Sequence, residues 1–305
     1  MKRYWFPVAA FAIAAALPFL IQGSYRHNVM ALMGVYAIAA LGLNLLVGIS
    51  GQISLGHGAF MSIGGYTAAF LTLKAGMPIW VGVPVAGLVS AVVGFLLGLP
   101  ALRLHGHFLA LATLSFGAAI PQIALKWQSV TGGAMGLMPP KFPSDRIAYW
   151  AVLGVLAVLV WVAHNLLESR PGRALRGVRD SEVAAQSMGV NLAVAKTSVF
   201  ALSAFYAGVA GALATHLSGF ISPTDFGILI SFQLLAAIVV GGLASIPGSI
   251  AGAVLVTFLP FAFSRSKGWA ATVEGFAIIG IVMFLPYGLA SLWQKIKEVS
   301  RRAAA

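Results

Sequence analysis

Apolar runs close to the length of a transmembrane helix recur along almost the whole chain. A helix of ~20 such residues crosses the hydrocarbon core of a bilayer with its backbone hydrogen bonds satisfied internally. Charged residues are only 9% of the 305, against roughly 25% in a soluble domain, which excludes a water-soluble fold. We predict an all-α, polytopic membrane helical bundle of about ten transmembrane segments (range about eight to ten), some broken or re-entrant. The runs lie at about residues 5–22, 29–48, 53–73, 79–99, 107–126, 148–168, 196–217, 228–244, 248–263 and 273–292.

Lysine and arginine in the connections predict the orientation, because cytoplasmic loops of membrane proteins are enriched in them. With the amino terminus inside, 12 of the 19 basic residues fall on the inner side and 7 on the outer side. Both termini are therefore expected in the cytoplasm. The first run follows Lys2 and Arg3 as in a signal peptide, but it is long and lacks a cleavage site, so we expect a retained helix. The net charge of +12 indicates contact with anionic membrane lipid and no nucleic-acid partner.

Residues 168–196 are the most charged stretch of the chain and read ESRPGRALRGVRDSEVAAQSMGVNLAVAK. They hold eight of the 26 charged residues, and each charge would be costly inside the hydrocarbon. The stretch is therefore predicted to be a cytoplasmic loop at about residues 169–195. It divides an otherwise continuous transmembrane domain, which we expect to be the single domain of residues 1–305.

This loop contains a short helix with an unusual profile. Pro171 and Gly172 are expected to end the preceding helix, and a helix is predicted over residues 180–189 with Gly189 as its stop. Ala184 and Ala185 make that helix slim enough to insert in a groove on a partner protein. A solvated linker is the alternative, although a linker has no need of two alanines followed by a glycine stop.

Several kinds of chemistry are missing from the sequence. None of the seven acidic residues lies near the centre of a predicted span, which argues against a proton- or sodium-coupled carrier. There is no phosphate-binding loop of the G-x-x-x-x-G-K-[ST] type, no cysteine, and no serine–histidine–aspartate group at a shared depth. His105 and His107 have no carboxylate nearby and are interpreted as part of an interfacial helix start. We predict no catalytic residue, no metal site and no cofactor in this chain, so the energy for its work comes from outside it.

Two apolar regions are rich in glycine and are candidates for broken helices. Residues 42–66 read GLNLLVGISGQISLGHGAFMSIGGY, in which Gly48 and Gly51 favour a break. Residues 239–253 read VVGGLASIPGSIAGA and share its Val-Gly entry and serine-bearing break. The pair is typical of a transporter repeat, but tight helix packing alone would also require these glycines. For His57 a buried, hydrogen-bonded role and a role in a water-filled path both remain open. A longer connection at residues 127–149 contains TGGAMGLMPPKFPSD and is either a rim for an outer partner or a solvated linker.

The charged loop resembles the coupling loop of ABC importer permeases, whose pattern is Glu-Ala-Ala, three residues and Gly. Here Val183 separates Glu182 from the two alanines. Other stretches resemble the branched-chain amino acid permeases of the LivM type, and together they span about residues 29–292. LALATLSFG after Arg103 and Leu104 favours that type over the related LivH-type and urea permeases. The matching stretches are residues 41–69, 131–137 (TGGAMGL), 172–191 (GRALRGVRDSEVAAQSMGVN), 204–213 and 238–248.

The resemblance implies a multi-pass permease subunit in a bacterial or archaeal plasma membrane, with no enzymatic activity of its own. It implies a heterodimer with a second, LivH-type permease. Two cytoplasmic ATP-binding subunits would bind the ATP and Mg²⁺, and an extracytoplasmic substrate-binding protein would deliver the ligand. Branched-chain or other hydrophobic amino acids are the expected cargo. Urea, other amino acids and aromatic carboxylates are alternatives, and an ion-coupled carrier or channel acting alone is a further one.

The resemblance also implies where coupling and transport take place. The contact with the ATPases is expected at Arg179, Asp180, Glu182, Ala184, Ala185 and Gly189. The translocation path is expected at Asn44, Ser50, Gln52, Ser54, His57 and Gln233.

Overall fold

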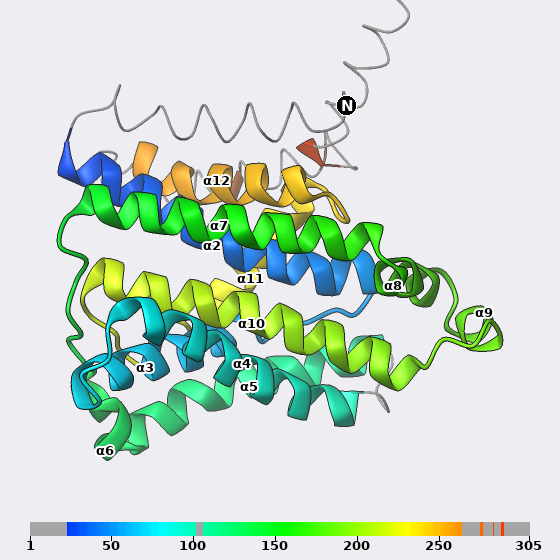
Figure 1. Ribbon diagram of the computed structural model, residues 1–305, viewed down its shortest axis with the longest axis horizontal. Helices are drawn as coiled ribbons and strands as arrows, with labels where there is room; N and C mark the ends of the chain where they lie inside the picture. The colour runs from blue at the N-terminus through cyan, green and yellow to red at the C-terminus, as the bar shows by residue number, and fades with distance from the viewer. Residues whose placement is uncertain (1–22, 102–105, 264–274, 277–282, 284–287, 290–305) are drawn as a thin grey trace, which may run out of the picture.

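The computed structural model describes residues 23–101, 106–263, 275–276, 283 and 288–289. Within them the regular secondary structure is helical, joined by turns and non-helical segments, with an antiparallel β-bridge between Leu137 and Ile221. The long helices lie side by side along the long axis of the molecule (Figure 1). The elements are α2 (Ser24–Asn44), the π-helix η1 (Leu45–Ile49), α3 (His57–Lys74), α4 (Ile79–Ala101), α5 (His107–Lys126), α6 (Gln128–Thr131), the 3₁₀ turn η2 (Gly133–Met135), α7 (Asp145–Glu168), α8 (Arg170–Asp180), α9 (Glu182–Ser187), α10 (Leu192–Ser218), α11 (Ile228–Gly241) and α12 (Ile246–Ala262).

The predicted polytopic helical bundle is confirmed. Among the described residues, five stretches are long and apolar enough to cross a membrane, and two shorter apolar helices, α11 and α12, accompany them. The segment predicted at residues 5–22, most of the one at 273–292, and the Arg103–Leu104 pair lie outside the described residues. The five stretches are Ser24–Ile49, Ile79–Pro100, His107–Lys126, Asp145–Glu168 and Leu192–Ser218.

Helices α2 and α10 form the centre of the bundle. In the most apolar part of each, 72% of the residues are buried by protein, whereas in α5 the figure is 22%. Exposed apolar side chains on α5, such as Leu111 and Ile123, therefore face the surroundings of the bundle, as expected for a helix next to lipid. Tyr206 of α10 is fully buried and donates a hydrogen bond to the carbonyl of Leu159 in α7 (2.7 Å).

Close backbone contacts between α3 and α10 explain many of the glycines. A Cβ atom on Gly64 would lie 2.1 Å from the carbonyl oxygen of Gly208, and one on Gly211 would lie 1.9 Å from that of Met61. Such distances leave no room for a side chain. Small residues of this kind let transmembrane helices approach and gain van der Waals contact, the main attraction between helices where lipid is as apolar as the side chains.

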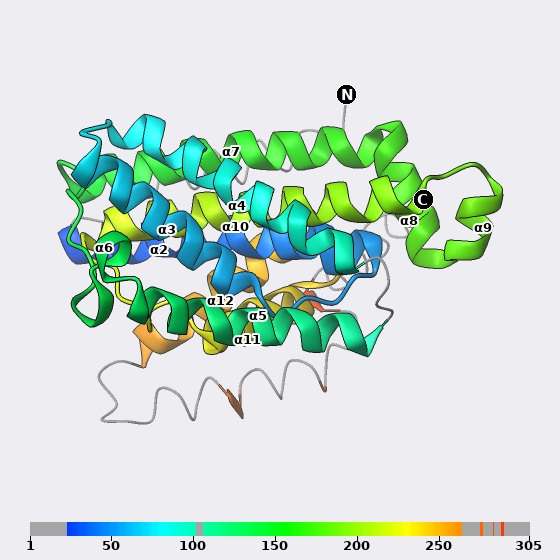
Figure 2. The same cartoon turned by 90° about the horizontal axis from the view of Figure 1, so that it is seen from below.

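The two ends of the bundle carry different elements. Helices α8 and α9 project beyond the bundle at one end, and α6 lies at the opposite end (Figures 1 and 2). We call these the α8 end and the α6 end. The loop that joins α7 to α10 is therefore the part of the described chain that reaches furthest from the bundle at the α8 end.

Two predicted spans are interrupted. The span predicted at residues 53–73 begins as helix only at His57, because residues 51–56 are non-helical and Gly51 has a φ of +74°. The span predicted at residues 228–244 is the 14-residue α11, which at 1.5 Å per residue is about 21 Å long and too short to cross a bilayer. Each of these two helices is preceded by a non-helical segment, residues 51–56 before α3 and residues 219–227 before α11.

We expect Gly64→Ala to destabilise the protein by about 1–3 kcal/mol, because the added methyl group overlaps the backbone of α10. Gly154→Ala on α7 is the matched control, since nothing lies within 4 Å of its Cβ position. That change should be neutral or stabilising by up to ~1 kcal/mol through helix propensity. Thermal unfolding of both variants in detergent measures the difference, and equal midpoints would contradict the close α3–α10 contact.

Candidate functional site

The α8–α9 unit at the tip of the molecule is built by local capping. The Ser169 side chain accepts a hydrogen bond from the Gly172 amide, and Pro171 occupies the first turn of α8. Pro171 and Gly172 thus begin α8 rather than end the preceding helix, which corrects the prediction. Proline suits this position because its missing N–H would have no partner in the first turn of a helix.

The predicted helix at residues 180–189 is shorter than expected. Ser181 has an extended backbone and caps α9 by accepting from the Ala184 amide (3.3 Å), so α9 spans only Glu182–Ser187 and Asp180 is the last residue of α8. Gly189 has a φ of +83°, which confirms its predicted role as the stop, because other residues rarely adopt this conformation.

The side chains assigned to the coupling contact point in different directions. Arg179 turns back toward the bundle and donates to the carbonyl of Gly48 in η1. Glu182 forms an ion pair with Lys196 of α10 (2.6 Å). Ala185 is buried next to Gly177 of α8. Of the two alanines, only Ala184 is exposed.

Two apolar side chains on this unit were not among the predicted contact residues. Val183 is 77% exposed and Met188 is 85% exposed. Both lie in a charged segment that projects beyond the bundle (Figure 1), so the described part of the chain leaves them uncovered. In the sequence, these two residues could have been found as isolated apolar residues within the charged loop, one before and one after the Ala-Ala pair.

The predicted break after α2 is present. The helix widens into the π-helix η1 and then stops, and the Gln52 amide donates to the carbonyl of Leu46 (3.2 Å). The Ser50 hydroxyl bonds the same carbonyl (2.7 Å) and accepts from Nε2 of Gln52 (3.0 Å). Ser50 and Gln52 therefore close the end of the broken helix.

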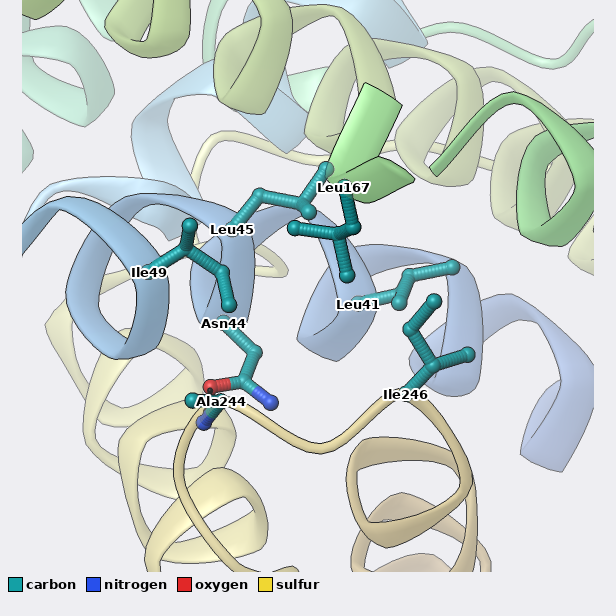
Figure 3. Close-up of a pocket in the computed structure, with 7 residues that line it drawn as sticks. All are labelled: Leu41, Asn44, Leu45, Ile49, Leu167, Ala244 and Ile246. Carbon is teal, nitrogen blue, oxygen red and sulfur yellow. Dashed lines mark hydrogen bonds between the residues drawn. The ribbon is translucent and has the colours of Figure 1, made fainter. Parts of the chain in front are cut away.

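Asn44 joins this break to the turn between α11 and α12 (Figure 3). Its Oδ1 accepts from the amide of Ala244 (2.9 Å), and its Nδ2 donates to the carbonyl of Ser245 (3.1 Å) and to the hydroxyl of Ser249. Ala244 has a φ of +62°, unusual for a residue with a side chain. Asn44 thus holds a strained turn in place.

His57, Ser54 and Ser203 form a chain of hydrogen bonds where α3 begins. The Ser203 hydroxyl donates to the carbonyl of Gly42 (2.6 Å), so it accepts from Nε2 of His57 (2.7 Å). Nδ1 of His57 then accepts from the Ser54 hydroxyl (3.3 Å). All three side chains are fully buried. Because Ser203 lies near the middle of the 27-residue α10, α3 begins about halfway along the bundle.

Helix α11 begins beside the start of α3. The Gly58 amide donates to the hydroxyl of Ser231 (2.9 Å), and a Cβ on Gly58 would lie 2.6 Å from the carbonyl of Gly227. From this junction α3 runs to the α6 end and α11 runs to the α8 end, near Asn44. The two amino termini meet at mid-depth, an arrangement that transporters with discontinuous helices use at their binding sites.

The predicted path residues therefore fall into separate places. Ser50 and Gln52 lie at the break, Ser54 and His57 lie at the start of α3, and Asn44 faces the α11–α12 turn. Gln233 is half-buried in the second turn of α11. The glycine-rich residues 239–253 span the end of α11, the turn at residues 242–245 and the first half of α12. The segment that meets α3 at mid-depth is residues 219–227. The sequence pattern had instead paired residues 42–66 with residues 239–253.

A crevice beside Asn44 is too small for a ligand. It has no room for even a water molecule, and its walls are mainly aliphatic (Figure 3). Among the described residues there is also no group of three or more histidine and acidic side chains that could hold a metal ion. The lining residues are Leu41, Asn44, Leu45, Ile49, Leu167, Ala244 and Ile246.

At the α6 end, the TGGAMGL stretch contacts the segment that precedes α11. Leu137 and Ile221 exchange both backbone hydrogen bonds (3.0 Å each). A Cβ on Gly136 would lie 2.2 Å from the carbonyl of Ile221. Met135 and Met138 are 87% and 74% exposed on this loop, which gives the α6 end an exposed apolar surface of its own.

Comparison with known proteins identifies similar chains. Residues 25–286 match the family described as "Branched-chain amino acid transport system / permease component". The LivM permease of the high-affinity branched-chain amino acid transport system of Salmonella typhimurium is 34% identical, over 95% of this chain and 75% of its own. LivM of Escherichia coli is 32% identical, over 100% of this chain and 79% of its own. LivH of Escherichia coli is 27% identical, over 89% of this chain and 96% of its own. No solved structure matches the chain.

We expect Asn44→Ala to lower the free energy of unfolding by about 1–3 kcal/mol, because the Ala244 amide and the Ser245 carbonyl lose a partner in a buried site. Gln122→Ala, which truncates an exposed amide side chain on α5, is the control and should change little. Thermal unfolding in detergent compares the two. A stability unchanged in Asn44→Ala would show that the turn does not depend on this side chain.

Proposed function

The chain belongs to the family of branched-chain amino acid transport system permease components, and from this premise we propose that it is the transmembrane permease subunit of an ABC importer. Its cargo is branched-chain or other hydrophobic amino acids. The partners are a LivH-type second permease, two cytoplasmic ATP-binding subunits and an extracytoplasmic substrate-binding protein. ATP and Mg²⁺ bind to the ATPase subunits, and this chain carries out no covalent chemistry.

The observation that carries this proposal is the α8–α9 unit. It projects from the bundle, is capped into a defined shape at Ser169 and Ser181, and presents exposed apolar side chains at Val183 and Met188. A linker between two membrane helices needs neither the caps nor the apolar tip. A partner with a groove lined by apolar side chains would bury them.

The distribution of acidic side chains supports an external source of energy. Of the described carboxylates, Asp180 and Glu182 lie on the α8–α9 unit, and Asp145 and Glu168 lie at the two ends of α7. Asp225 lies two residues before Gly227, but it is exposed and accepts hydrogen bonds from the backbone and hydroxyl of Ser222. An ion-coupled carrier would need a buried carboxylate at mid-depth, and these five do not supply one.

In the proposed mechanism the ATPases drive the α8–α9 unit. Closure of the ATPase pair on ATP moves α8 and α9, and the attached helices rock as rigid bodies to change access from one side of the membrane to the other. The α8 end is then cytoplasmic, and the binding protein docks at the α6 end. The role of the six predicted path residues in transport stays a prediction.

Reconstitution tests this function against the main alternative. Vesicles holding this chain with its second permease, both ATPases and the binding protein are expected to take up leucine, isoleucine or valine only with ATP inside. Uptake by this chain alone under an ion gradient would instead support an independent carrier. Calorimetry on the binding protein with amino acids, urea and aromatic carboxylates identifies the cargo.

A substitution at the tip tests the docking surface. We expect Met188→Asp to weaken association with the ATPase subunits by about tenfold or more, because it places a charge at the centre of an apolar contact. Met135→Asp is the matched control, since Met135 is equally exposed but lies at the α6 end. Co-purification of the ATPases with each variant is the measurement, and equal losses for both would contradict docking at α9.

A further inference from the structure

Lys196 is a buried cation in the first turns of α10. Its side chain is 7% exposed, and its Nζ lies 2.6 Å from Oε2 of Glu182 on α9, whose side chain is 38% exposed. Removing one partner of a buried ion pair leaves an uncompensated charge, which is strongly unfavourable. Because Lys196 has this one acidic partner among the described contacts, movement of α9 away from α10 would break the pair.

The backbone of Lys196 also touches the broken segment. Nε2 of Gln52 donates to the carbonyl of Lys196 (3.4 Å) and to the hydroxyl of Ser50 (3.0 Å). Gln52 is buried and is the second residue of the non-helical stretch that leads to α3 at mid-depth. One residue of α10 is therefore bonded on its side chain to α9 and on its backbone to the start of residues 51–56.

Arg179 makes a second connection between the same two regions. Its guanidinium donates to the carbonyl of Gly48 in the π-helix η1, where a regular helical hydrogen bond is missing. Its Cγ lies 3.3 Å from the Cβ position of Gly51. The α8–α9 unit is thus connected to the break in two ways, directly through Arg179 and indirectly through Glu182 by way of Lys196 in α10.

We propose that Lys196 is a positioning residue for transport, which transmits movement of α9 through the Glu182–Lys196 ion pair to Gln52 and residues 51–56. This inference rests on the proposed function, because it assumes that α9 is moved by an ATPase. It gives Glu182 a partner within the chain rather than on the ATPase. The segment that receives the movement leads to the mid-depth junction of α3 and α11, where a change in access would take place.

Three variants of the complete reconstituted transporter, each compared with the original, test the proposal. Lys196→Met should lower ATP-dependent uptake by about tenfold, the scale of a typical coupling between sites, while the complex assembles and hydrolyses ATP. The exchanged pair Glu182→Lys with Lys196→Glu should recover most of the uptake, because it restores the ion pair. Lys126→Met, which removes an exposed lysine at the end of α5, should leave uptake unchanged.

The exchanged pair separates positioning from other roles. If Glu182 served the ATPase directly, the lysine at position 182 would abolish uptake in the exchanged variant as well, and the proposal would be overturned. Unchanged uptake in Lys196→Met would also overturn it. A ratio of uptake to ATP hydrolysis that falls in Lys196→Met and returns in the exchanged variant supports it, because a simple folding defect lowers both quantities together.

A measurement without ATPases keeps this inference distinguishable from the proposed function. In the isolated permease, amide hydrogen exchange of residues 51–56 should rise in Lys196→Met and return toward the original rate in the exchanged variant. Unchanged exchange would overturn the connection even if the importer works. Absence of ATP-driven uptake in the original complex would overturn the proposed function, and with it the transport role of Lys196.

Discussion

The bilayer's lack of hydrogen-bonding groups is the constraint on which this structure depends. Residues 51–56 and 219–227 leave helical structure inside the bundle, so their backbone groups need partners from the protein. Thr113 accepts from the Leu55 amide (3.0 Å), and Ser231 accepts from the Gly58 amide (2.9 Å). Residues 51–56 thus receive a hydrogen-bond partner from the neighbouring α5. In residues 219–227 the Ile221 amide donates to the carbonyl of Leu137, and the Ser222 amide donates to the carboxylate of Asp225.

Glycine residues let these hydrogen-bond partners reach the breaks, because they allow the helix backbones to come into direct contact. On α3, Gly64 meets α10, and Gly58 meets the segment before α11. The dense glycines therefore serve two purposes in one region, since they allow the helix to break and let its neighbours approach the break. From the sequence, a helix break and tight helix packing were alternative explanations of these glycines. In the structure both apply.

The two breaks are connected to opposite ends of the molecule. Residues 51–56 begin next to the α8–α9 unit, which is proposed to meet the ATPases. Residues 219–227 begin at the Leu137–Ile221 bridge, on the loop with exposed Met135 and Met138. Both segments end at the junction of Gly58 and Gly227. A partner bound at either end would contact an element that leads to the same point at mid-depth, which suits an importer that must coordinate two sides of a membrane.

The sequence by itself determined the class of fold, the charged loop and its glycine stop, and the family. These follow from local properties: hydrophobic length, the cost of charge in lipid, and motifs read within one stretch. The start of α8 was wrong because a proline can end one helix or begin the next, and a neighbouring serine cap decides between them. Tertiary structure alone decided that Glu182 pairs with Lys196, that Asn44 holds the turn at Ala244, and that residues 219–227 meet α3. Each of these depends on contacts between residues separated in the chain, which exist only once the helices have packed.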